Sequence, residues 1–236
     1  MGISTDLSDL KDIHCGSKAF VLGAGPSLHY ENLSQIWKYP VICTNSSILL
    51  TRWTGCCEAE EINRRFWTSN DALCMRWSYF EKWVVPAKCF KIVRDSWAKH
   101  GKKLTKFGLR FFAPRRSVHI EPDGGGLCAV SSVPTAVDLA LHMGCKEIYV
   151  LGQDHQRMGN INYFWQYWSR SQWPRFNGQI GYIPDKISQN TVYGQNVPIF
   201  EELRRYAESL DAKLYNCSRH SKLKSLEFKP LGQAFA

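Results

Sequence analysis

The sequence predicts an α/β fold in which a mostly parallel sheet carries helices on both faces and an aromatic lid is inserted. Short runs rich in β-branched and aromatic residues alternate with helical patterns, as in sheets whose parallel strands are joined by crossover helices. The chain has 236 residues, 44% of them hydrophobic, so we expect residues 1–236 to form one domain with a sizeable core. The expected strands are Ala19–Leu22, Val41–Asn45, Arg65–Ser69, Phe90–Val93, Glu147–Leu151 and Lys213–Asn216.

The best-marked helix precedes the strand at 147–151. Apolar residues recur at helical spacing from Val133 to Leu141, and Pro134 falls in the first turn. Gly144 follows the last turn, where glycine commonly ends a helix. These features predict a complete amphipathic helix.

A second helix is expected before the strand at 213–216. Asn196 can cap it, and Pro198 fits its first turn, because the first turn leaves its N–H groups unpaired and proline has none. Apolar side chains recur on one face of this helix, at Ile199, Leu203, Tyr206 and Leu210.

The first expected strand runs directly into Gly23-Ala24-Gly25-Pro26-Ser27, which is followed by a helical pattern. Glycines let the backbone turn tightly and approach a ligand, and first-turn proline and serine leave helix N–H groups free to face an anion. We therefore interpret this segment as a nucleotide-phosphate site. A packing role for the glycines is the alternative, because Leu28 stands where the dinucleotide fingerprint has its third glycine.

Composition argues against several classes of protein. No apolar run reaches the length that spans a membrane, and the N-terminus has no signal-peptide pattern, so we expect a cytoplasmic protein with no membrane partner. The nine cysteines include no Cys-x-x-Cys pair, so they give neither a disulfide framework nor the spacing of a zinc site. Dependence on Mg²⁺ and the oligomeric state are left open by the sequence.

The formal charge of +9 is concentrated in one segment. Residues 94–116 hold eight basic side chains against one acid, Asp95, which gives this segment a net charge of +7. The segment is either a solvated face or a patch for a polyanion such as DNA. Under the second interpretation, the nucleic-acid-binding residues are Lys102, Lys103, Lys106, Arg115 and Arg116.

Residues 155–184 contain no acidic side chain and many aromatic ones, and we interpret residues 155–196 as a lid or insertion. The aromatic side chains either form a local core or stack on sugar rings and nucleobases, for which mixed basic and aromatic residues are suited. Trp165 and Trp168 are the expected stacking residues for nucleic acid.

In open α/β sheets ligands bind outside the carboxyl ends of the strands, so polar residues that follow strands are the candidate site residues. Neutral side chains of this kind can bind sugar hydroxyls or phosphate oxygens, whereas an aspartate-histidine pair can orient a donor and move a proton. Capping a turn and packing in the core are the structural alternatives for that pair. The candidates from this rule are Asn45, Ser46, Gly152, Gln153, Asp154, His155 and Ser218. Ser131 and Ser132 are further candidates, because they precede the helix at Val133 and hydroxyls at a helix N-terminus suit anion or sugar contacts.

Four pieces of the chain together resemble the linked motifs of two related groups of proteins. They are Val-Leu-Gly-Ala-Gly-Pro-Ser-Leu at 21–28, the Thr44-Asn45 step, Ser131-Ser132 before its helix, and the run from Gly144 to Asp154. One group is the bacterial sialyltransferases that use a CMP-sugar. The other comprises domains similar to the archaeal 6-hydroxymethylpterin diphosphokinase, and similar chains occur in phage genomes. The resemblance covers roughly residues 18–28, 41–47, 128–155 and 196–220.

This resemblance implies a Rossmann-like fold that binds a nucleotide across Gly23–Ser27, Asn45 and Gly152–Asp154, beneath a lid. In the sialyltransferases a lid histidine is the general base and tyrosines assist phosphate departure. Tyr163 stands in a comparable place, whereas residues 156–196 contain no histidine. The family's base therefore has no counterpart in this chain.

The leading hypothesis is a glycosyltransferase that moves a sugar from a nucleotide-sugar donor to a hydroxyl acceptor. Asn45 and Asp154 would orient the donor, and His155 or Asp185 would deprotonate the acceptor. The acceptor would be a hydroxymethylated base in phage DNA, in the host cytoplasm, or a glycan. The alternatives are a diphosphokinase-like phosphotransferase, with Mg²⁺ held by the carboxylates of Asp154, Asp71 and Asp123, and a non-catalytic nucleotide- or nucleic-acid-binding module.

Overall fold

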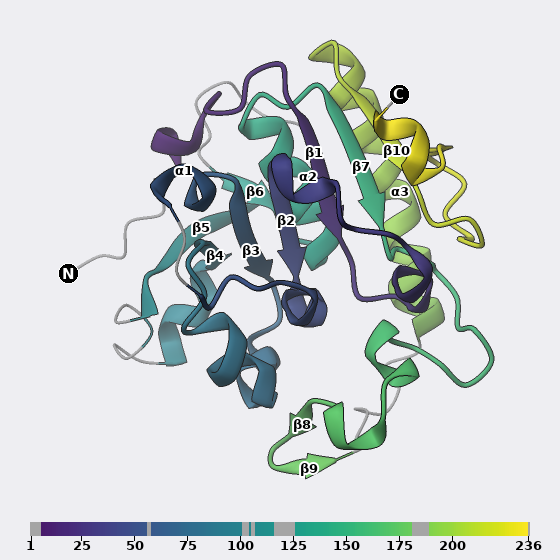
Figure 1. Ribbon diagram of the computed structural model, residues 1–236. Coiled ribbons are helices and arrows are strands. Elements are labelled where there is room, and N and C mark those ends of the chain that lie inside the picture. Colours follow the sequence, from purple (N-terminus) through teal and green to yellow (C-terminus); the bar gives the residue numbers. More distant parts are fainter. Residues whose placement is uncertain are drawn as a thin grey trace.

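The computed structural model describes residues 6–55, 58–100, 104, 107–115, 126–180 and 189–235. In these residues nine strands form one parallel sheet in the order β11-β10-β7-β1-β2-β3-β4-β5-β6 (Figure 1). Its bounds are β1 Lys18–Leu22, β2 Val41–Thr44, β3 Arg65–Ser69, β4 Phe90–Arg94, β5 Leu109–Arg115, β6 Gly126–Cys128, β7 Glu147–Leu151, β10 Lys213–Asn216 and β11 Glu227–Phe228. The predicted α/β, Rossmann-like fold is confirmed.

All six predicted strands are present, with ends that differ by at most one residue from those expected. Three further strands of this sheet, β5, β6 and β11, are not predicted by the sequence. β5 contains Pro114, a residue that disfavours a strand, and lies in the basic segment. The other two strands have only three and two residues, too short for an alternating pattern to stand out.

The sheet is buried on both faces, and successive side chains of its strands enter different cores. Phe66 of β3 packs in the core beneath the long helices, whereas its neighbour Trp67 packs in the core on the opposite face. In β4, Ile92 and Val93 divide in the same way. Burial on both sides explains why these strands are nearly continuous apolar runs.

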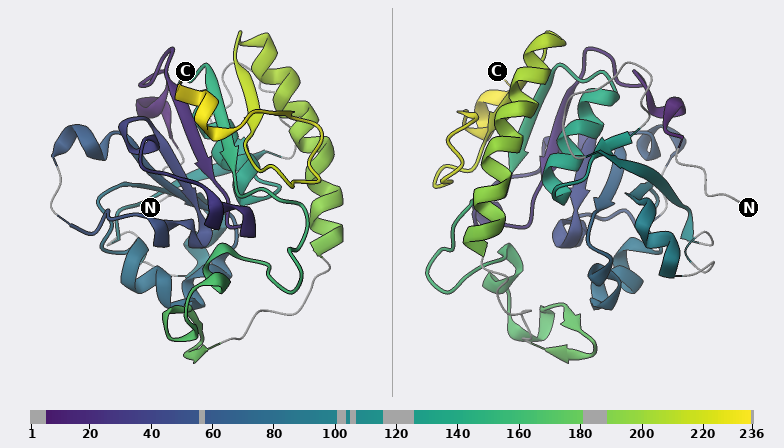
Figure 2. Two further views of the ribbon diagram at one scale, coloured as in Figure 1. Left: turned by 45° about the vertical axis from the view of Figure 1, so that its right-hand side comes forward. Right: turned by 180° about the vertical axis from the view of Figure 1, so that it is seen from behind.

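Two long helices, α2 (Ser132–His142) and α3 (Gln189–Ser209), cover one face, as seen from behind in Figure 2. The short α1 spans Ala59–Ile62. No helix in the described ranges is long and apolar enough to span a membrane. Single-turn helices are η1 Ser8–Leu10, η2 Pro26–Tyr30, η3 Ile36–Lys38, η4 Asn45–Leu50, η5 Ala72–Arg76, η6 Phe80–Val84, η7 Asp95–His100, η9 Phe164–Tyr167, η10 Arg170–Gln172 and η11 Leu231–Phe235.

The first predicted helix is confirmed as α2, with Pro134 in its first turn and Gly144 beyond its end at φ +80°. The predicted start of the second helix is wrong. α3 begins at Gln189, so Pro198 lies inside the helix and Asn196 is not its cap. An interior proline costs about 3 kcal/mol, which burial of apolar side chains such as Phe200 and Leu203 offsets.

The strand order reverses between β1 and β7. The chain moves outward from β1 through β2 to β6, then returns through α2 to place β7 on the other side of β1. This reversal is the point at which open α/β sheets form a crevice outside the carboxyl ends of their strands. The segment after β7, with the hairpin β8 (Arg175–Phe176) and β9 (Gln179–Ile180), extends beyond that edge (Figure 1).

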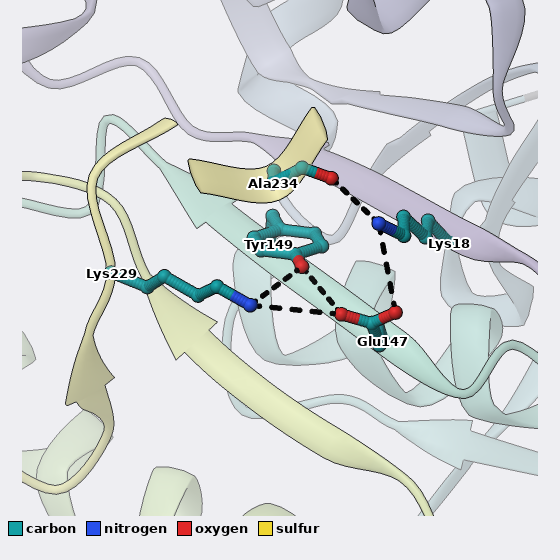
Figure 3. Close-up of polar contacts among 5 residues, drawn as sticks. All are labelled: Lys18, Glu147, Tyr149, Lys229 and Ala234. Carbon is teal, nitrogen blue, oxygen red and sulfur yellow. Dashed lines mark hydrogen bonds and ion pairs between the residues drawn. The ribbon is translucent and has the colours of Figure 1, made fainter. Parts of the chain in front are cut away.

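A C-terminal strap, residues 227–235, folds back across the sheet and is held by a small charged cluster (Figure 3). Lys229 Nζ lies 3.2 Å from the Tyr149 hydroxyl and 3.8 Å from the Glu147 carboxylate. Lys18 Nζ lies 3.8 Å from the same carboxylate and donates a 2.7 Å hydrogen bond to the Ala234 carbonyl. Because Lys18 and Glu147 belong to β1 and β7, the strap is fixed to the two central strands.

Candidate functional site

The loops that follow β1 and β7 are joined directly to each other. Gly23 N–H donates to the Leu151 carbonyl at 2.7 Å, and Gly25 N–H donates to the Gly152 carbonyl at 2.8 Å. Ser27 N–H then donates to Asp154 Oδ2 at 2.8 Å. The structure thus brings together the glycine segment and the predicted residues after β7, at the point where the strand order reverses.

The two glycines of this segment are required by the contact between the loops. A Cβ atom on Gly25 would lie 2.4 Å from Asp154 Oδ2 and 2.6 Å from the Gly152 carbonyl oxygen. A Cβ atom on Gly23 would lie 2.4 Å from that same oxygen. The packing interpretation of these glycines is therefore supported, because their close approach is to protein backbone and carboxylate.

The expected row of free helix N–H groups is corrected as well. The element after the loop is the five-residue 3₁₀-helix η2, not an α-helix, and the N–H of Ser27 is bonded to Asp154. Pro26 has no N–H, and those of Gly23 and Gly25 bond to the other loop. Within the described residues, Ala24 keeps an N–H group that makes no hydrogen bond.

We predict that Gly25→Ala destabilises the folded protein by about 1–3 kcal/mol, since the added methyl group overlaps backbone and carboxylate atoms that cannot both move away. Chemical unfolding measures the loss. The matched control is Gly194→Ala, where an added Cβ meets nothing within 4 Å. Equal stability of the two variants would show that the loops do not pack as described.

Asp154 is buried, with 5% of its surface exposed, and it anchors the start of η2. Burial raises the pKa of its carboxyl group, an effect that the neighbouring Ser27 and Ser218 oppose. In the described part of the chain, its Oδ1 atom and the Ser27 hydroxyl have no partner in hydrogen-bonding geometry. The geometry therefore supports the structural role of Asp154, in which Oδ2 caps the turn at Ser27.

His155 is also buried, with 5% of its surface exposed, and its ring packs 6.1 Å from that of Phe200. Its backbone is left-handed, at φ +52°, and its Nε2 lies 2.8 Å from Gln153 Nε2. Burial lowers the pKa of the imidazole from 6.5 to about 4. The imidazole is therefore neutral at physiological pH and sits in the core beside α3.

We predict that His155 makes the protein acid-sensitive. Its pKa is lower in the folded than in the unfolded chain, so its contribution to stability is complete above about pH 6.5 and is lost as the pH falls toward 4. Urea unfolding between pH 7 and 4 should show a smaller loss of stability in His155→Asn, which retains a residue tolerant of positive φ. The exposed His220 provides the control, His220→Asn. Parallel pH profiles of wild type and His155→Asn would refute this role.

Ser218 supports the backbone of the loop after β7 and is buried. Its hydroxyl accepts hydrogen bonds from Gly152 N–H at 2.9 Å and Gln153 N–H at 3.3 Å, and 2% of its surface is exposed. Ser221 adds a 2.7 Å bond from its hydroxyl to the Gln153 carbonyl. The phosphate contact expected of Ser218 is therefore replaced by a structural one, and the conformation of residues 152–154 is fixed from two sides.

Asn45 follows β2 and lies beside the N-terminus of α2. Its backbone is left-handed at φ +50°, which asparagine tolerates better than most residues. Its Oδ1 accepts hydrogen bonds from the Ser69 hydroxyl at 2.7 Å and the Ser132 hydroxyl at 3.3 Å. Because two hydroxyl donors fix Oδ1, the amide orientation is set and Nδ2 is left as a donor with no partner among the described residues.

Further neutral polar side chains surround the start of α2. Asn70, directly after β3, donates from Nδ2 to Thr135 Oγ1 at 2.8 Å, and its N–H donates to Ser132 Oγ at 3.0 Å. Ser131 Oγ donates to Asn196 Oδ1 of α3 at 2.9 Å. Asn45, Ser131 and Ser132 thus belong to one connected hydrogen-bond network. Thr135, which also donates to the Ser131 carbonyl, was not predicted, because a hydroxyl at a helical position is a weak signal, and Asn196 was predicted only as a helix cap.

The lid aromatics form a local core, which corrects the stacking role expected for Trp165. This indole has 2% of its surface exposed, stacks on Tyr163 at a centroid distance of 5.1 Å, and donates to the Ser46 hydroxyl at 3.2 Å. Trp168 is half-buried, edge-on to Phe164. Phe164 N–H in turn donates to the Ala24 carbonyl at 3.2 Å, so the lid is attached to the glycine loop.

The basic segment is only partly described. Lys102, Lys103, Lys106 and Arg116 lie outside the described residues, as does Asp185, and Arg115 is described only as part of β5. Arg110 is engaged within the protein, because it forms an ion pair with Asp9 and lies 4.9 Å above the Phe90 ring. The nucleic-acid interface remains a prediction for the other basic residues.

Comparisons with protein-family models and with curated proteins found no match to this chain. The geometry of the strand ends is therefore the basis on which its function is inferred.

Proposed function

We propose that the chain binds a nucleotide-sugar at the carboxyl edge of its sheet and transfers the sugar to a hydroxyl acceptor. The observation that carries this proposal is the set of contacts of Asn45, whose Oδ1 is bonded to Ser69 and Ser132 and whose Nδ2 donor has no partner among the described residues, one strand from the strand-order reversal. Neutral amide and hydroxyl groups match the hydroxyls of a ribose or hexose without the desolvation cost of a charge.

Two groups in the glycine loop and the lid attached to it suit the departing phosphate. The Ala24 N–H group is available in the glycine loop. Tyr163 lies on the lid, where burial raises the pKa of its phenol, so the hydroxyl stays protonated and can donate a hydrogen bond. A donor that gains strength as charge develops on the leaving phosphate lowers the barrier to transfer.

Asp154 has a positioning role in this proposal. It fixes Ser27 and hence the glycine loop, and it does not need to touch the donor. Proton removal from the acceptor by His155 or Asp185 stays a prediction, as does a hydroxymethylated DNA base as the acceptor. The buried Trp165 and the paired Arg110 do not contribute to such a DNA surface.

Calorimetric titration with CDP, UDP, GDP and ATP, each with and without Mg²⁺, tests the proposal. We expect a nucleoside diphosphate to bind without requiring Mg²⁺ and the matching nucleotide-sugar to be hydrolysed slowly when no acceptor is present. Binding of ATP that depends on Mg²⁺ would favour the phosphotransferase alternative. Nucleotide binding without sugar release would favour the non-catalytic module.

Asn45→Ala and Asn45→Asp should each weaken nucleotide binding by about tenfold, because both remove the Nδ2 donor, and the second preserves side-chain shape. The matched control is Asn177→Ala. Asn177 is also left-handed, at φ +47°, but lies in the turn of the β8–β9 hairpin. Unchanged affinity in both Asn45 variants would refute the proposed donor site.

A further inference from the structure

A cavity of about 450 Å³ lies on the other side of the glycine loop from Asn45, where β10 and the C-terminal strap meet η2. Ser27, Tyr30 and Glu31 line it from η2 and the residue after it, and Arg219 lines it from the loop after β10. Its size falls within the range of pockets that enclose small organic ligands. The nucleotide site proposed above makes no use of it.

The charges at this cavity are opposite and separated. Glu31 is half-buried, and burial together with the nearby Asp154 carboxylate raises the pKa of its carboxyl group. Arg219 attracts Glu31, yet the two side chains form no ion pair among those of the described chain. Two neighbouring carboxylates favour a cation between or beside them, whereas a guanidinium favours an anion.

Much of the remaining lining is apolar, and its polar side chains are those of Ser27, Tyr30 and His220. Met158, Phe228, Pro230 and Leu231 line the cavity, and the last three belong to the C-terminal strap that Lys229 and Lys18 fix to the sheet (Figure 3). The Ser27 hydroxyl, on a residue with 5% of its surface exposed, lies beside the Asp154 carboxylate and lowers the pKa of that group, although no described residue meets it in strict hydrogen-bonding geometry. A hydroxyl has one donor site and two acceptor sites, so Ser27 can also bond a polar group of a ligand in this cavity.

We propose that this cavity binds an α-amino acid with an apolar side chain, its carboxylate on Arg219, its ammonium group on Glu31 and its side chain against the strap. A zwitterion satisfies both separated charges at once, whereas a simple anion would face the carboxylates of Glu31 and Asp154. The ammonium group or the carboxylate also supplies a partner for the Ser27 hydroxyl. This assignment is independent of the nucleotide site.

Calorimetric titration of the full chain with L-phenylalanine, L-leucine and L-methionine tests the assignment. We expect at least one to bind with a dissociation constant in about the micromolar to millimolar range. N-acetyl-L-phenylalanine lacks the ammonium charge and L-phenylalaninamide lacks the carboxylate, so each should bind about ten- to a hundredfold more weakly than phenylalanine if phenylalanine binds. The corresponding derivatives of leucine or methionine serve if one of these is the ligand. Failure of all three amino acids to bind would overturn the proposal.

Variants assign each charge to its partner. Glu31→Gln should lower the affinity for the free amino acid about tenfold and leave the affinity for the N-acetyl derivative unchanged. Arg219→Gln should lower the affinity for the free amino acid and leave the affinity for the amide unchanged. Ser27→Ala should weaken binding of the amino acid, because the variant removes a hydroxyl that lines the cavity. Glu81→Gln and Arg52→Gln, at exposed positions outside the cavity lining, are matched controls. Full affinity in both Glu31→Gln and Arg219→Gln would overturn the proposal even if the amino acid binds.

Discussion

The contact between the loops after β1 and β7 is the constraint on which the rest of the carboxyl edge depends. Parallel neighbours end at the same edge, so their loops must either diverge or pack, and here they pack closely enough that only glycine fits at positions 23 and 25. The bond from Ser27 N–H to Asp154 completes this junction. One junction therefore separates two regions, the polar network around Asn45 and the cavity beside Glu31.

The junction places a carboxylate in the interior, and its cost is visible in the raised pKa of Asp154. A buried charge is tolerated where hydrogen bonds stabilise it, and the Ser27 N–H supplies one such bond. Glu31 lies in the field of this carboxylate, since Asp154 raises the pKa of the Glu31 carboxyl group. This shared negative potential links the structural role of Asp154 to the ligand preference that we infer for the cavity.

Much of the fold could be predicted from sequence because burial on both sides of a parallel sheet produces apolar runs such as 147–151. The strand β11 could not be predicted from sequence. Its two residues pair with β10 in a strap that the distant contacts of Lys229 and Lys18 hold in place. The predicted start of α3 was wrong because proline usually stands in the first turn of a helix. Here Pro198 lies inside the helix, since the burial of Phe200 outweighs that preference. The strand-end rule predicts Asn45, and the start of the helix at Val133 predicts Ser132. Glu31 and Arg219 carry no local signal, because tertiary folding alone makes them neighbours.

The most direct test of the junction is the stability of Asp154→Asn compared with Asp154→Ala. Asparagine keeps an oxygen for Ser27 N–H and removes the buried charge, whose cost grows as the pH rises above the ordinary pKa of 3.8 through the raised value. We predict that at neutral pH Asp154→Asn is at least as stable as wild type, and that Asp154→Ala loses about 1–3 kcal/mol because the buried N–H is unpaired. An equal loss of stability in both variants would contradict this account, since it would show that the charge itself holds the loops together.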